Sequence, residues 1–197
     1  SNEGNLFVSL LLQPEKPLKE IPQLSFVAAV SAIEALEDML PKQHPLQCKW
    51  PNDILLNGKK LGGILLESFQ TESNKHWVVV GVGINIDTAP SKTEFPATSL
   101  KEAGVELVSA KIILSRFIHH FIDCYNIWNT KGFTPIRKKW TAHAWGIDQR
   151  LCARLPEGNM EGICLGLDTD GALQLKLDNG KKHLVHAGDV FPAEVEA

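Results

Sequence analysis

Long hydrophobic runs are missing from this sequence, and so is a strong excess of charge of one sign. No apolar stretch approaches the roughly 20 residues that cross a bilayer, and the N-terminus has no signal-peptide pattern. Lysine and arginine together number 20 against 23 acidic residues, and the net charge of −3 carries no electrostatic signature of nucleic-acid binding. We therefore expect a soluble, cytoplasmic protein that binds neither membrane nor nucleic acid.

Cysteine is scarce as well. The four cysteines lie far apart, without a C-x-x-C spacing, at positions 48, 124, 152 and 164. This pattern indicates reduced, mostly buried thiols rather than a disulfide framework or a zinc site. Hydrophobic residues, in contrast, are plentiful: at 44% of 197 residues they suffice for one large domain with its own core and a smaller one beside it.

Two textures divide the chain near Gly146. Before this point, hydrophobic periodicity predicts strands over 6–12, 46–50, 53–56, 59–68 and 76–86, and helices over 22–40, 109–129 and 134–142. Ser25 and Ser109 are the expected N-caps of the two long helices, and Asn57-Gly58 predicts a two-residue hairpin turn. Beyond it come short alternating strands separated by turns. The sequence therefore predicts an α+β domain over 1–146 and a small β-barrel over 147–197.

Glycines interrupt two of the expected strands. VVVGVGIN carries Gly81 and Gly83 ahead of Asn85, and KLGGIL carries Gly62 and Gly63. A glycine inside a strand costs stability and marks a bulge or a close approach of the backbone to a ligand. For the first segment alone the two readings are equal, but two such strands side by side would leave a slot for a flat molecule. Because no third glycine opens a helix, the pattern is not a dinucleotide-binding fingerprint.

A lysine stands between a strand and a turn in KWPND. If the segment is extended, Lys49 and Trp50 point to opposite faces of the sheet, and Trp50 is the one expected to pack inward. Lys49 would then lie near the glycine strands, where an ammonium group can neutralise a carboxylate or a phosphate. An exposed lysine at a sheet edge is the alternative. The stiff Pro51 and the Asn52-Asp53 turn that follows it favour the site.

Histidines and acids crowd the expected helix at 109–129. His119, His120, Asp123 and Cys124 lie within six residues, but no H-E-x-x-H pattern accompanies them. A partly solvated helix face is therefore favoured over a metal site.

The segments KWPND, NGKKLGGILLES, VVVGVGIN and ATSLKE, in this order and spacing, resemble the catalytic domain of biotin–protein ligases. The resemblance extends to the helix at 109–129 and to the C-terminal β-module. It implies a class II synthetase-like α+β fold with a mixed sheet, followed by an SH3-like barrel. It also implies that biotin is activated by ATP and Mg²⁺ to biotinyl-5′-AMP and then transferred to a lysine of a biotin carboxyl carrier domain, as in acetyl-CoA carboxylase. Lipoate–protein ligases share the fold but generally not these motifs.

The resemblance assigns residues to the biotin side of the site. Lys49 is the cation where the biotin carboxylate and the α-phosphate of ATP meet, since two anions forced together need a fixed positive charge. Gly63, Gly81 and Gly83 let the backbone lie against the rings of biotin, and Ile54 is an apolar wall.

Other residues are assigned to the nucleotide side. Asn85 is the candidate for holding the adenylate phosphate or its Mg²⁺, and Thr98 and Ser99 lie in the segment expected near the adenine. Asn52 and Asp53 are candidates for orienting Lys49 or the acceptor lysine, although a turn-forming role for this pair is an equal alternative.

The chain departs from the family pattern in two places. Relatives commonly carry an arginine shortly after the acidic position of the last strand, whereas Pro192-Ala193 follows Asp189-Val190-Phe191 here. The chain also starts beyond the family's Gly-Arg-rich loop, so we expect it to be a slow catalyst by itself, and it has no winged helix to support a DNA-binding repressor.

Two alternatives to a ligase of biotin stay open at this point: a non-catalytic biotin- or carrier-binding module of the same fold, and a relative of the lipoate–protein ligases. Lys49 and Asn85 favour the ligase, because a mere binder of biotin does not need a phosphate-facing cation. Monomer and homodimer are equally compatible with the sequence.

Overall fold

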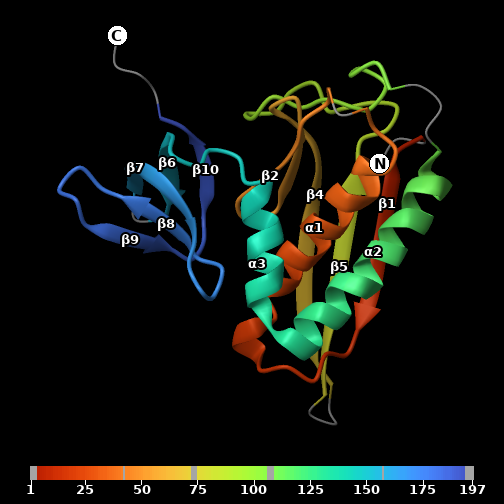
Figure 1. The fold of residues 1–197 in the computed structure, drawn as a ribbon, viewed down its shortest axis with the longest axis horizontal. Helices are drawn as coiled ribbons and strands as arrows, with labels where there is room; N and C mark the ends of the chain where they lie inside the picture. The colour runs from red at the N-terminus through yellow and green to blue at the C-terminus, as the bar shows by residue number, and fades with distance from the viewer. Residues whose placement is uncertain (1–3, 42, 72–74, 106–108, 157, 194–197) are drawn as a thin grey trace.

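The computed structural model describes residues 4–41, 43–71, 75–105, 109–156 and 158–193. Over these residues the chain forms a larger domain, in which helices cover one face of a β-sheet, and a smaller all-β module beside it (Figure 1). No helix in the described part of the chain is long and apolar enough to cross a membrane.

The sheet of the larger domain has five strands in the order β1-β5-β4-β3-β2. They are β1 (Leu6–Leu12), β2 (Leu46–Lys49), β3 (Asp53–Leu56), β4 (Lys59–Gln70) and β5 (His76–Ile84). The α+β fold is as expected, but the sheet is not mixed: every pair of neighbouring strands in the described residues is antiparallel. Short connections lead from β2 to β5, and such turns can join only antiparallel neighbours, since parallel strands need a long crossover.

The turn between β3 and β4 confirms the hairpin prediction. Asn57 and Gly58 both adopt positive φ, at 52° and 72°, as the central residues of a type I′ turn do. The turn pairs Leu56 with Lys59 and Leu55 with Lys60, and a one-residue register shift between Ile54 and Leu55 then pairs Asp53 with Gly63. The hairpin therefore aligns the end of KWPND with the glycine pair.

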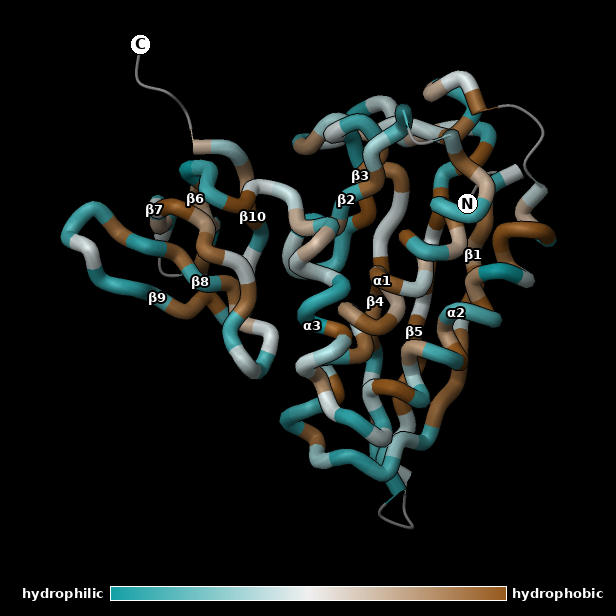
Figure 2. The backbone as a smooth tube through the Cα atoms, in the orientation of Figure 1, coloured by the Kyte–Doolittle hydropathy of each residue, from teal (hydrophilic) through white to brown (hydrophobic). Residues whose placement is uncertain are grey.

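Helix α1 (Gln23–Glu37) is the central element of the helical layer. It packs against α2 (Ala110–Lys131), α3 (Phe133–Ala142) and the sheet, and only Glu34 and Glu37 of its 15 residues are not buried. The prediction of a single apolar face therefore underestimated the burial of this helix, because two helices and the sheet surround it. Hydrophobic segments gather accordingly where α1 meets the strands (Figure 2).

One of the two predicted helix caps is correct. Ser109 is the N-cap of α2, and its hydroxyl accepts a hydrogen bond from the Ile112 N–H. The prediction of Ser25 for α1 was wrong. The N-cap is Pro22, three residues earlier, and its ring holds φ at −56°, which favours a first helical turn there.

The C-terminal module is a five-stranded antiparallel sheet in the order β10-β6-β7-β8-β9. Its strands are β6 (Arg150–Leu155), β7 (Gly158–Leu167), β8 (Leu173–Lys176), β9 (Lys182–Val185) and β10 (Asp189–Pro192). The expected domain boundary at 146/147 falls between α3 and β6. Trp50 connects the two parts, because its indole N–H donates to the Gly171 carbonyl at 3.1 Å.

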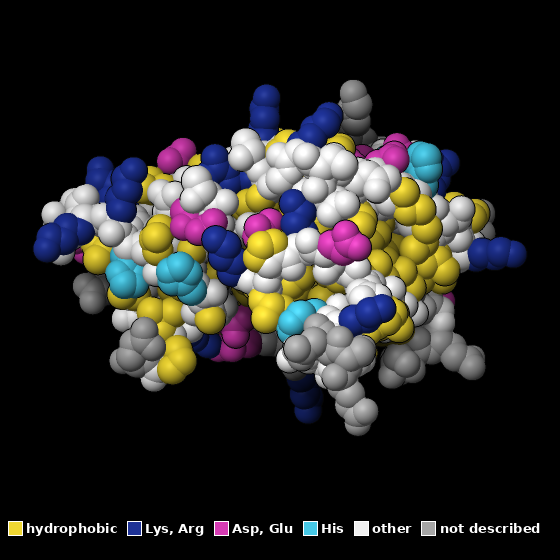
Figure 3. Space-filling view, turned by 90° about the horizontal axis from the view of Figure 1, so that it is seen from below, with side chains coloured by type: hydrophobic (Ala, Val, Ile, Leu, Met, Phe, Trp, Pro, Cys, Tyr) yellow, Lys and Arg dark blue, Asp and Glu magenta, His cyan; other side chains and the backbone are white. Residues whose placement is uncertain are grey.

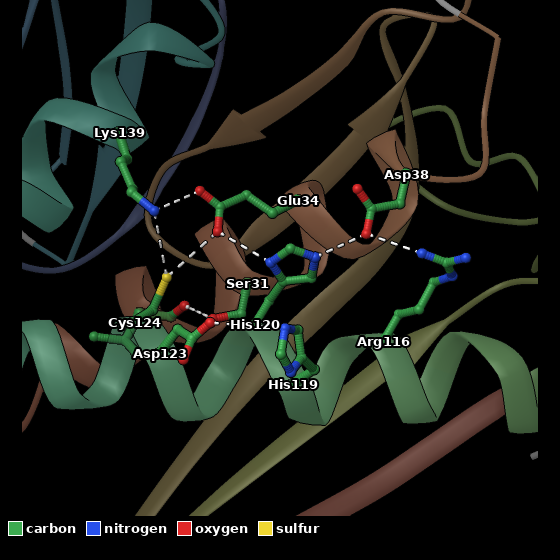
Figure 4. A network of polar contacts seen from close by, with 10 residues as sticks. Ser31, Glu34, Asp38, Arg116, His119, His120, Asp123, Cys124 and Lys139 are labelled. Carbon is green, nitrogen blue, oxygen red and sulfur yellow. Dashed lines mark hydrogen bonds and ion pairs between the residues drawn. The ribbon is translucent and has the colours of Figure 1, made fainter.

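A polar network joins the three helices (Figure 4). Glu34 accepts a hydrogen bond from the Lys139 ammonium at 2.6 Å and lies 3.5 Å from His120 Nδ1, while His120 Nε2 lies 2.9 Å from an Asp38 oxygen. The Cys124 thiol also points at Glu34, at 3.6 Å. The expected partly solvated helix face is thus found at His119 and Asp123, which are exposed, whereas His120 points toward α1. Among the described residues no cluster of His, Cys, Asp and Glu is arranged to hold a metal ion.

The cysteine prediction is confirmed: all four thiols are free, three of them are buried, and Cys152 is half-buried. Some large hydrophobic side chains remain exposed. Seen from below, hydrophobic atoms gather over the larger domain (Figure 3), and exposed large residues of its sheet are Phe7, Leu11, Leu65 and Phe69.

Candidate active site

A cavity of about 410 Å³ opens at one end of the sheet, a size typical of small-molecule sites. Three parts of the chain build its walls: the five-stranded sheet β1–β5 with Asn85 directly after it, the segment 88–97, and strand β10 of the C-terminal module. We call residues 88–97 the rim segment. The lining residues are Phe7, Lys49, Asp53, Lys60, Gly62, Gly63, Gly83, Asn85, Pro90, Thr93, Glu94, Phe95, Ala97, Asp189 and Phe191.

Lys49 lies in this cavity as expected. It ends β2, and its side chain points to the cavity while the Trp50 side chain is buried on the other side, against the C-terminal module. Lys49 is only 2% exposed, and its Nζ lies 3.5 Å from an Asp53 carboxylate oxygen. Burial lowers the pKa of the Lys49 ammonium, and the Asp53 carboxylate opposes part of this shift.

Asp53 lies between two lysines. Its second carboxylate oxygen is 2.5 Å from Nζ of Lys60, a residue that the sequence did not single out. Lys60 is 39% exposed and lines the cavity, so its ammonium is the more accessible of the two. The hairpin register contained the signal: Lys60 pairs with Leu55, two residues beyond Asp53 and hence on the same face of the sheet.

Two aromatic rings enclose the Lys49 ammonium. Its Nζ lies 4.9 Å from the ring centre of Phe95, in the rim segment, and 5.4 Å from that of Phe191, in β10. The two rings are tilted against each other by 54°, with their centres 6.5 Å apart. A ring face attracts a cation but excludes water, so this aromatic box holds the ammonium in place and desolvates it. No local pattern in the sequence connects these three residues.

The glycines have different surroundings. Gly63 and Gly83 line the cavity, and a Cβ built on either would meet only side chains or ordinary contacts. Gly62 also borders the cavity, but a Cβ there would lie 2.3 Å from the Gly83 carbonyl oxygen. Glycine is therefore required at this position because β4 and β5 pack closely there. Gly81 precedes Gly83 by two residues in β5 and lines a neighbouring cavity, which shares Phe7 with the first. Of these glycines, Gly63 and Gly83 are the ones whose backbone is open toward the cavity.

Ile54, expected as an apolar wall of the site, lies elsewhere. It is fully buried and belongs to the core between the sheet and the helices. The reason is the strand alternation: Asp53 and Leu55 point to the cavity side of β3, so Ile54 between them points to the core.

Asn85 lines the cavity directly after β5. Its amide nitrogen donates to the Thr98 carbonyl at 3.1 Å, which leaves the side-chain oxygen as the acceptor that can face a ligand. Thr98 and Ser99, at 6% and 0% exposure, are not among the lining residues. The Ser99 hydroxyl donates to the Asp87 carbonyl, so these two residues brace the wall from behind.

Asn52 forms hydrogen bonds within the sheet. Its side-chain amide donates to the Ile64 carbonyl at 2.7 Å, and its own carbonyl accepts from the Ile64 N–H at 2.8 Å. These bonds tie the start of β3 to β4 and support the turn-forming role for Asn52, whereas Asp53 faces the cavity.

The cavity of this α+β domain thus carries two ammonium groups around one carboxylate, a net positive charge next to the glycine-bearing strands. In the comparisons with known proteins, residues 1–142 match the biotin/lipoate A/B protein ligase family, and residues 146–191 match the biotin protein ligase C-terminal domain. The chain belongs to this family.

Individual relatives support the assignment. A bifunctional ligase/repressor BirA of Bacillus subtilis is 38% identical over 194 residues, which is 95% of this chain and 58% of the relative. A biotin–[acetyl-CoA-carboxylase] ligase of Paracoccus denitrificans is 34% identical, across 95% of this chain and 80% of the relative. The chain thus spans less than two thirds of the first of these relatives.

The fold is similar to that of solved structures. Biotin protein ligase from Aquifex aeolicus in complex with biotin and ATP has a TM-score of 0.82 and 27% identity, and the match covers 97% of this chain and 79% of that one.

Proposed function

We propose that this protein is a biotin–protein ligase, which activates biotin with ATP and transfers it to a lysine of a biotin carboxyl carrier domain. The observation that carries the proposal is the position of Lys49, Asp53 and Lys60 beside Gly63 and Gly83. Family membership and the biotin and ATP complex of the Aquifex aeolicus relative support it.

In the first step, an oxygen of the biotin carboxylate attacks the α-phosphorus of ATP, and pyrophosphate leaves with the bond electrons. Negative charge builds up where the two anions meet. Lys60, the more accessible cation, contacts the reacting groups, and Lys49 adds a second positive charge from inside the aromatic box. Such groups stabilise the transition state because they are oriented before the reaction begins.

Asp53 keeps the two ammonium groups apart and in place. With one carboxylate between two lysines, the trio carries a net positive charge toward an anionic substrate. The same carboxylate is the proposed partner of the acceptor lysine in the second step. There the amine of the carrier attacks the acyl carbon of biotinyl-5′-AMP, an amide bond forms, and AMP leaves.

The glycine strands supply the surface for biotin. At Gly63 and Gly83 the backbone is open toward the cavity, so a flat bicyclic ring can lie against it. Asn85 is proposed to contact the adenylate phosphate, and the rim segment around Ala97 to face the adenine.

Magnesium fits the donor set in part. The Asn85 side-chain oxygen is a hard oxygen ligand of the kind that Mg²⁺ accepts, and Mg²⁺ typically keeps phosphate oxygens and waters as its remaining ligands. When bound with ATP, the ion would neutralise phosphate charge during pyrophosphate departure.

Biotin-dependent exchange of labelled pyrophosphate into ATP, measured on the full-length protein, tests the proposal. We expect exchange with biotin and not with lipoate, followed by labelling of a purified carrier domain. Biotin binding without exchange would instead identify a non-catalytic binding module, and exchange with lipoate alone would identify a lipoate ligase. A cytoplasmic location goes with this function, since free thiols persist in a reducing compartment.

A further inference from the structure

Arg154 reaches from the C-terminal module to the wall of the cavity. It lies on β6, opposite Asp189 of β10, and its guanidinium forms an ion pair with Glu94 of the rim segment. Glu94 itself lines the cavity. The pair therefore connects the rim segment with the C-terminal module, and both contribute residues to the cavity lining.

The same guanidinium also packs against the aromatic box. Its central carbon lies 4.0 Å from the ring centre of Phe191, one of the two rings around Lys49. The other ring, Phe95, follows Glu94 directly in the chain and rests edge-on against Trp145, with ring centres 5.7 Å apart. Arg154 thus stacks on the ring face of Phe191 and is tied by its ion pair with Glu94 to the segment that carries Phe95.

We propose that Arg154 is a positioning residue of the catalytic site: its contacts with Glu94 and Phe191 hold the rim segment on the C-terminal module and so keep the aromatic box closed around Lys49. The inference rests on the function proposed above and adds to it that the C-terminal module sets the geometry of the activation step.

Folding stability alone does not account for this ion pair. The Arg154 and Glu94 side chains are 46% and 62% exposed, and ion pairs between exposed side chains contribute little to folding stability. The position of the pair matters more, because a loosened box would let the Lys49 ammonium move and take up water. Loss of this preorganisation lowers the rate of the chemical step and leaves the glycine surface for biotin untouched.

The test uses charge reversal in the full-length protein. Arg154→Glu and Glu94→Arg are prepared singly and together, so that the double variant restores an ion pair with its direction reversed. Arg150→Glu is the matched control: Arg150 lies on the same strand, but its ion pairs with Asp178 and Glu161 stay within the C-terminal module. The readouts are kcat for biotin-dependent pyrophosphate release, Kd for biotin, and amide hydrogen exchange across residues 88–97.

Each single reversal should lower kcat by about tenfold, the size expected for coupling between neighbouring groups, and speed exchange in the rim segment. Biotin Kd should change little for Arg154→Glu, because Arg154 is not among the residues that line the cavity. The double variant should recover most of the kcat and the exchange protection, and Arg150→Glu should change neither.

Two results would overturn the inference: single reversals that leave rim-segment exchange and kcat as in the unsubstituted protein, or losses that add up in the double variant instead of cancelling. If the unsubstituted protein itself releases no pyrophosphate with biotin, the proposed function fails. The exchange measurement then still decides whether Arg154 holds the rim segment, because it does not depend on activity.

Discussion

The Lys49 ammonium lies 3.5 Å from the Asp53 carboxylate, and both side chains are almost fully buried although they face a cavity. Two residues four apart in the chain meet because the turn after Trp50 reverses the chain and pairs Lys49 with Asp53 across β2 and β3. Removing either charge would leave the other desolvated, which is costly unless a further partner is present. Lys60 is that partner for Asp53.

Replacing Lys49 with alanine should abolish most biotinyl-adenylate formation and leave the protein folded. Loss of one oriented charge at such a transition state costs about 3 kcal/mol, which is about a hundredfold in rate. Pyrophosphate release is the measurement, and Lys59→Ala, at an exposed neighbour outside the cavity lining, is the control. Near-normal release by the Lys49→Ala protein would remove this lysine from the mechanism.

Two glycines that border the same cavity should respond differently to added side chains. Gly83→Val places a side chain in the cavity, where its Cβ lies 3.3 Å from the edge of the exposed Phe7 ring, which can move. We expect the melting temperature to change little and biotin affinity to fall by about 10–100-fold, the cost of overfilling a site. Calorimetric titration with biotin measures this, and unchanged affinity would show that no ligand lies against Gly83.

Gly62→Ala is the matched variant for the sheet. Its Cβ would lie 2.3 Å from the Gly83 carbonyl oxygen, so β4 and β5 must separate. The expected loss is about 1–3 kcal/mol in the free energy of unfolding. Urea denaturation that gives the same midpoint as the unsubstituted protein would contradict this.

The activation step should lose rate on the alkaline side below pH 10.5, because Lys49 must be charged and burial holds its pKa below that ordinary value. For stability the sign is that of any group whose pKa is lowered by folding. The unfolded chain binds this proton more tightly than the folded one, so the Lys49 contribution to unfolding free energy rises with pH between the two pKa values.

The Lys49→Arg variant tests whether Lys49 itself, and not a neighbouring group, causes the loss of rate at high pH. A guanidinium stays charged throughout the range, so the alkaline limb of the pH–rate profile should move to higher pH even if the maximal rate falls. Lys60, Asp53 and Asp189 are the other charged groups near this position. A limb that does not move would show that the Lys49 ammonium does not set it.

The helix network predicts a stability effect away from the cavity. Glu34→Ala removes the shared partner of Lys139 and His120, both only partly exposed, and should cost about 1–2 kcal/mol of unfolding free energy. The comparison is Glu37→Ala on the same helix, whose more exposed carboxylate has His143 as its ion-pair partner at 3.7 Å; its cost should stay below about 0.5 kcal/mol. Equal costs for the two variants would mean that the network adds nothing.

Local patterns in the sequence determined much of this protein. The Asn57-Gly58 turn sets the β3–β4 hairpin because positive φ at both positions suits a tight turn. Alternation placed Lys49 and Trp50 on opposite faces, and the interrupted strands marked Gly63 and Gly83 as points of backbone access. These features depend on residues a few positions apart, which sequence periodicity reports directly.

Tertiary packing decided the rest. Whether α1 is buried on one side or on several depends on how many layers surround it, and Ile54 went to the core because the hairpin register gave the cavity face to Asp53 and Leu55. The aromatic box joins Lys49 to Phe95 and Phe191, which come together only when the C-terminal module docks on the larger domain. No periodicity encodes such a contact, because it arises from the fit of two surfaces and not from the spacing of residues along one strand or helix.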